Sequence, residues 1–182
     1  LRPTDPIEFA QAYTASLSGD DAEHVITTWF DWHEVARRAF ADDFTSMSQE
    51  HRDATASMLR DMLLFPHIDP TLDEHYDNAA YSDFFIDQAS SETIVIYTIS
   101  TTVPIEQELI HRLHLEPREH GALIAVDIDA GRGLTISRRL AAAYPLIKQL
   151  ENKTPHAFIS DFHDMATTRL REAREAAEAD SP

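Results

Sequence analysis

The sequence predicts an α+β fold, in which a twisted antiparallel sheet of about four strands packs against helices from both ends of the chain. Apolar residues recur at helical spacing before residue 80 and after residue 134. Short alternating segments joined by polar connections lie between them. We therefore expect one domain over residues 1–182, helical over 1–79 and 135–178, with the sheet over 80–130.

Capping residues mark the helices that precede the sheet. Asp5 and Pro6 have the N-cap and first-position order that begins a helix. Ser46 and Gln49 stand in capping-box spacing and are expected to begin the longest early helix, which Pro66 and Pro70 are expected to end.

Alternation predicts four strands, at about 81–88, 92–101, 105–115 and 121–129. The second strand, "SETIVIYTIST", is apolar on both faces. Val95, Tyr97 and Ile99 point one way, and Ile94 and Ile96 point the other. Helices must therefore cover both faces of this strand, or helices cover one face and a ligand covers the other.

Composition narrows the classes of function. The net charge of −17 argues against binding to nucleic acid or to anionic lipid headgroups, and is typical of a protein kept soluble and monomeric by its charge. There is no cysteine, hence no disulfide and no thiol chemistry. No apolar run approaches the ~20 residues of a membrane-spanning helix.

The ten histidines raise the question of a metal site. His111 and His114 lie three residues apart on one predicted strand and so point to opposite faces. His163 lies between Asp161 and Asp164 in a predicted helix, where neighbouring side chains diverge. We therefore expect no metal and no cofactor.

An enzyme with one carboxylate base in an apolar pocket is the alternative from the residues alone. The strands could place Asp83, Asp87 or Asp127 in such a pocket, and Asp127 is the best candidate. Asp127 could instead anchor the following loop, "DAGRGLT", by accepting hydrogen bonds from backbone N–H groups. The glycines of that loop favour the second interpretation.

Three segments resemble the MlaC, or toluene-tolerance, family of periplasmic lipid-binding proteins. The first is "FDWHEVARRAFADDFTSMSQEHRDATASMLRDML", in which the matching residues are Phe30, Asp31, Phe44, Ser48 and Arg52. The second is the run of strands from Tyr81 to Ile128, and the third is "GLTISRRLAAAYPLIKQL". The chain departs from the family pattern at Ala41, where the family usually has glycine, and at Ala141, where it usually has arginine.

The resemblance implies a carrier with no covalent chemistry. Family members enclose an apolar cavity between sheet and helices, which takes phospholipid acyl chains and leaves the headgroup outside. They shuttle the lipid through the periplasm between membrane-anchored subunits of an ABC transport system and an outer-membrane complex. A ligand-free interaction domain of the same fold, with its core filled by side chains, remains an alternative beside the enzyme.

The lipid-binding residues expected here combine one face of the sheet with the end of the long early helix. They are Met62, Phe65, Phe85, Val95, Tyr97, Ile99, Leu109, Leu113, Ile124 and Val126. The expected partners are a phospholipid or similar amphiphile and the transporter subunits, with no nucleic acid.

Overall fold

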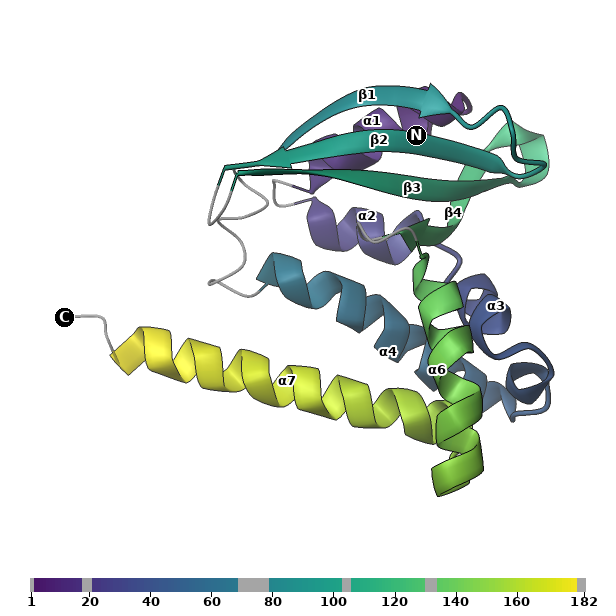
Figure 1. Cartoon of the computed structure of the whole chain (residues 1–182), viewed down its shortest axis with the longest axis vertical. Helices are drawn as coiled ribbons and strands as arrows, with labels where there is room; N and C mark the ends of the chain where they lie inside the picture. The colour runs from purple at the N-terminus through teal and green to yellow at the C-terminus, as the bar shows by residue number, and fades with distance from the viewer. Residues whose placement is uncertain (1, 18–20, 69–78, 103–105, 130–133, 180–182) are drawn as a thin grey trace.

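The computed structural model describes residues 2–17, 21–68, 79–102, 106–129 and 134–179, and they form an α+β fold (Figure 1). The helices before the sheet are α1 (Pro6–Ser16), α2 (Ala22–Thr28), α3 (Trp32–Thr45) and α4 (Gln49–Ile68). The sheet comprises β1 (Ala80–Ile86), β2 (Thr93–Thr101), β3 (Gln107–Pro117) and β4 (Leu123–Asp129), with the short η1 (Glu119–Gly121) before β4. The helices after it are α6 (Ile136–Glu151) and α7 (Pro155–Ala179).

The first helix begins as predicted. The Asp5 side chain accepts hydrogen bonds from the backbone N–H groups of Ile7 and Glu8, at 2.9 and 3.0 Å, and Pro6 is the first helical residue. These bonds satisfy two of the N–H groups that a helix N-terminus leaves without intrahelical partners.

The predicted start of the longest early helix is wrong, and of the two prolines predicted to end it, Pro66 lies within the helix and Pro70 lies outside the described residues. Ser48 caps α4, because its hydroxyl accepts from His51 N at 3.3 Å, whereas Ser46 donates to the carbonyl oxygen of Asp43 at the end of α3. Pro66 lies inside α4, which continues to Ile68. A proline removes one backbone hydrogen bond and strains the preceding turn, but this cost does not end the helix here.

Helix α3 is interrupted at Ala41. This residue has φ 47° and ψ −123°, a conformation that favours glycine, so the helical path breaks between Phe40 and Asp42. A residue with a side chain is rare in this region of φ and ψ, so Ala41 costs backbone strain.

Within the described residues the sheet has the order β1-β2-β3-β4, and each neighbouring pair is antiparallel. Val95 lies opposite Leu113, Tyr97 opposite His111, and Ile99 opposite Leu109. Directly opposed residues share a face, so the predicted faces of these two strands are confirmed. We call the face that bears these residues the inner face, and the opposite one the outer face.

A bulge in β1 reverses the expected orientation of Phe85. The pairing shifts between Ser82 and Phe85, where Asp83 has φ 55°. Phe85 consequently lies opposite Ile96 on the outer face and is 52% exposed, while Phe84 lies on the inner face against Tyr97. One extra residue in a strand moves every later side chain to the other face.

A second bulge interrupts the alternation of side chains in β4. Leu115 pairs with Ala125 and His114 with Asp127, so Val126 is the extra residue. Ile124 pairs with Glu116 on the outer face. Ile124 and Val126, both predicted for the inner face, are therefore displaced from it, and Ala125 takes the inner position.

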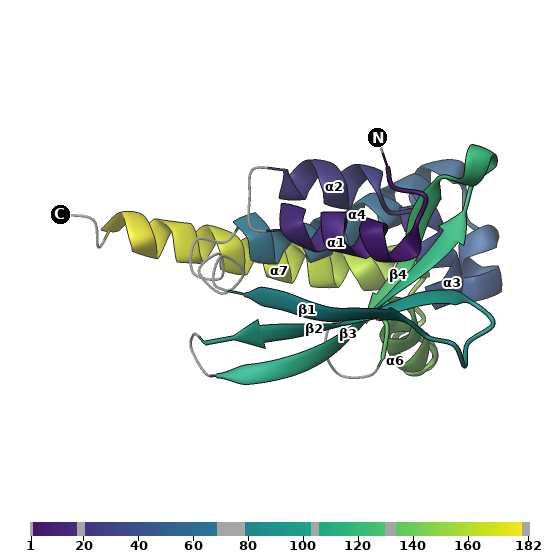
Figure 2. The ribbon, with the colours of Figure 1, turned by 90° about the horizontal axis from the view of Figure 1, so that it is seen from above.

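The helices lie mainly on the inner side of the sheet. Helix α1 contacts β1 and β2, with α2 beside it (Figure 2). Helix α4 contacts α2, and α7 packs against α4 on the side away from the sheet (Figure 1). The segment before α3 covers the edge of β4, where Asp31 N donates to Ala125 O and Ala125 N to Trp29 O, both at 2.8 Å. None of the described helices combines the length and apolarity that crossing a membrane requires.

Candidate functional site

The inner face is closed over most of its length and partly open at one end. Val95 and Leu113 are 0% exposed and Tyr97 is 1% exposed, so the helices cover them completely. Further along the same strands, Ile99 is 7% exposed and Leu109 is half-buried. We call this less covered part of the inner face the open end; its residues are Tyr81, Phe84, Ile99, Leu109 and His111.

Strand lengths explain the position of the open end. Strand β4 pairs with β3 only from Arg112 to Pro117, so the first part of β3, Gln107–His111, has no neighbour on that side among the described strands. The first three strands thus extend beyond the fourth and present an inner surface of their own (Figure 2).

Aromatic rings form much of that surface. Phe84 stacks on Tyr97 with ring centroids 5.5 Å apart and planes 18° apart, and Tyr97 contacts His111 at 5.7 Å. Tyr81 lies 6.3 Å from Tyr97. Tyr81 and His111 are tilted against Tyr97 by 49° and 46°, so the four rings form one aromatic cluster across β1, β2 and β3.

Helix α4 contributes apolar side chains to the hydrophobic core beneath the sheet. Met62 and Leu63 are partly buried and pack against the core. The flexible thioether of methionine adapts to irregular apolar surfaces. The side chain of Phe65, predicted for the same role, lies outside the described residues.

Two groups of predicted site residues are thus separated. Leu109 and Met62 are partly buried, whereas Val95, Tyr97 and Leu113 belong to the closed core. Ile99, at 7% exposure, lies in the same core next to the open end. The remaining strand residues, Phe85, Ile124 and Val126, are the ones displaced from the inner face by the bulges.

The sequence analysis missed His111 as a member of this face, although simple alternation places it between Leu109 and Leu113. Burial lowers the pKa of His111 from 6.5 to about 4; the charge of Asp129 opposes this shift and that of Arg139 adds to it. The imidazole is therefore neutral at pH 7. His114 lies on the opposite face, as predicted, where its Nδ1 is 2.9 Å from a Glu92 carboxylate oxygen.

Asp127 is buried and hydrogen-bonded to the start of α6. It is 2% exposed on the outer face, and its carboxylate accepts hydrogen bonds from the backbone N–H of Ser137, at 3.2 Å, and from the Ser137 hydroxyl. It thereby fixes the first turn of α6 against β4. The residues between them, 130–133, lie outside the described part of the chain.

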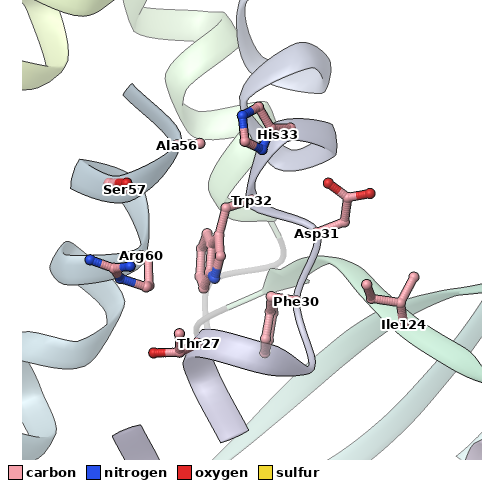
Figure 3. Close-up of a pocket in the computed structure, with 9 residues that line it drawn as sticks. All are labelled: Thr27, Phe30, Asp31, Trp32, His33, Ala56, Ser57, Arg60 and Ile124. Atoms are coloured by element: carbon pink, nitrogen blue, oxygen red, sulfur yellow. The ribbon is translucent and has the colours of Figure 1, made fainter. Parts of the chain in front are cut away.

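A separate pocket of about 370 Å³ lies between the start of α3 and α4 (Figure 3). Phe30 and Trp32 stack at 4.9 Å, and Trp32 Nε1 donates to Ile26 O at 2.9 Å. Its polar groups hold the structure together: Asp31 accepts from Glu34 N at 2.9 Å as the cap of α3. The pocket shares no residue with the open end, and its chemistry indicates no ligand.

Neither a scan against protein-family models nor a search of the curated proteins gives a match. Among solved structures, the fold is similar to that of a phospholipid-binding protein from Ralstonia solanacearum, determined in complex with a phospholipid. The TM-score is 0.64 at 12% sequence identity, over 91% of this chain and 97% of that one. At this identity the likeness establishes a shared α+β fold over nearly the whole of both chains.

Proposed function

We propose that this protein binds a phospholipid or a similar amphiphile at the open end of the inner face. The observation that carries the proposal is the partly exposed apolar surface of Tyr81, Phe84 and Leu109 beside the buried Ile99, in a fold shared with a phospholipid-binding protein. Large apolar surfaces left between the layers of a domain mark binding sites more often than they persist unused.

The energetics suit such a ligand. Each buried CH₂ group of an acyl chain contributes ~0.8 kcal/mol, so two chains give ample affinity without a headgroup contact. The net charge of −17 repels anionic membrane surfaces, so the protein would not remain adsorbed to them.

The role we propose is carriage of the lipid through the periplasm between membrane-anchored transporter subunits, with no covalent change to the ligand. The sequence resemblance to the MlaC family supports the carrier role and the compartment. The engagement of Asp127 with Ser137 on the outer face supports carriage over catalysis, because this carboxylate was the best candidate base.

A pair of matched substitutions tests the location of the site. Leu109→Glu puts a charge on the open end, and Phe85→Glu puts the same charge on the outer face, where the side chain is 52% exposed. We expect uptake of fluorescent phospholipid from vesicles to be lost in the first variant and retained in the second, with both folded by circular dichroism.

The opposite pattern, loss in Phe85→Glu with retention in Leu109→Glu, would place the site on the outer face. No uptake by the unsubstituted protein would remove the proposed function.

A further inference from the structure

The open end is apolar except for the Tyr81 hydroxyl and the His111 imidazole. His111 is half-buried, and no hydrogen bond reaches either of its ring nitrogens within the described part of the chain. Its ring contacts the ring of Tyr97, and the charges of Asp129 and Arg139 act on it electrostatically. Its ring nitrogens are not among the fully buried side-chain atoms that lack a partner, so a ligand can reach them. A neutral imidazole has one N–H donor and one acceptor, which leaves a donor for such a ligand.

His111 also stands at a particular place in the sheet. The next residue, Arg112, lies opposite Asp129 at the end of β4, so His111 is the first residue of β3 beyond the cover of that strand. It faces inward beside Leu109, at the border between the closed core and the free edge of β3. A ligand lying on the open end would meet its imidazole where the molecule passes over that edge.

Resting on the lipid-binding function proposed above, we propose that His111 selects ester-linked amphiphiles, because its imidazole N–H donates a hydrogen bond to an ester carbonyl of the bound molecule. The carbonyl supplies an acceptor that none of the described residues provides.

The surroundings favour an uncharged acceptor over a phosphate. Burial keeps the imidazole neutral, so it offers no positive charge to an anion. The charges of Asp129 and Arg139 act on the ring with opposite signs, and the Asp129 carboxylate, itself 0% exposed, lies 3.8 Å from the Arg139 guanidinium. Arg112, the basic side chain nearest along the strand, points to the outer face and pairs with Asp129 at 3.1 Å.

The test compares two phospholipids that differ only at the linkage. Dipalmitoyl phosphatidylcholine has two ester carbonyls, and its dihexadecyl ether analogue has none. We expect the unsubstituted full chain to bind the ester lipid about three- to ten-fold more tightly, the range for one neutral hydrogen bond. His111→Phe keeps an aromatic ring against Tyr97 but removes the donor, and is expected to bind both lipids equally.

His24→Phe is the matched control, since it makes the same change on the exposed surface of α2 and should keep the preference. Equal binding of the two lipids by the unsubstituted protein would overturn the inference, and this comparison stands even if His111→Phe does not fold. A preference that survives in His111→Phe, or disappears in His24→Phe, would also overturn it. Failure to bind either lipid would instead remove the proposed function itself.

Discussion

Replacing Ala41 by glycine should stabilise the protein. Ala41 has φ 47° and ψ −123° at the break in α3, and its side chain is exposed, so the substitution loses no packing. A non-glycine residue in such a sparsely populated region costs on the order of 1–3 kcal/mol. Glycine removes that strain but gives the unfolded chain more conformational freedom, worth about 0.4–1 kcal/mol in the opposite direction.

The expected net effect of Ala41→Gly is a gain of about 1 kcal/mol in the free energy of unfolding, equivalent to a rise in Tm of about 2–4 °C at this chain length. Urea unfolding followed by circular dichroism would measure it. Ala142→Gly is the control, because Ala142 is an exposed residue in the regular part of α6, where glycine should cost about 0.5–1 kcal/mol. If Ala41→Gly is as destabilising as Ala142→Gly, the reasoning from backbone strain is wrong.

Two further predictions concern ionisable residues. Asp127→Asn should lower the free energy of unfolding by about 1 kcal/mol, because it weakens the charge-assisted bonds to Ser137, while lipid uptake persists; lost uptake in a folded variant would contradict the anchoring role. Burial lowers the pKa of His111 to about 4; the charge of Asp129 opposes this shift and that of Arg139 adds to it. As the pH falls, the unfolded chain therefore takes up a proton on this residue at a higher pH than the folded protein does. The free energy of unfolding should therefore be highest above pH 6.5 and decrease as the pH falls towards 4. The decrease is expected to reach up to about 2 kcal/mol after allowance for the partial exposure of the ring. Urea titrations of the His111→Gln variant should show a flatter decline over that window, and identical curves would refute the assignment.

The faces of β2 and β3 could be predicted from sequence because their alternation is uninterrupted. Val95 and Tyr97 pair with Leu113 and His111 in an unbroken register, so a period of two residues describes both strands. The helix boundaries were less predictable. Ser46 matches the capping-box spacing, but α3 continues to Thr45 and uses that serine at its own end.

The errors in the candidate site come from two bulges. In β1 the bulge lies at Asp83, and in β4 at Val126, and neither position has the glycine that would signal an irregular strand. Each bulge breaks the alternation of its strand, so the residues before it and those after it no longer share the face that a period of two residues predicts. Phe85 was therefore predicted for the inner face in place of Phe84, and Ile124 in place of Ala125.

His111 was missed for a different reason. The sequence analysis considered it only as a metal ligand, and its neighbour His114 on the other face argued against that role. Its alternation with Leu109 and Leu113 was available in the sequence and assigns it to the inner face. The partial burial of its imidazole depends on the packing of the whole domain, so it could not be predicted from the strand sequence.

The central claim is that the open end binds lipid. The most direct test is to measure the amount of lipid bound to the purified protein. The full chain would be isolated without detergent, its mass measured under native conditions, and its lipids extracted and identified by mass spectrometry. The account predicts about one phospholipid or related amphiphile for each protein molecule, released on unfolding and replaced from vesicles afterwards. Protein that is free of lipid as isolated and takes up none from vesicles would contradict it.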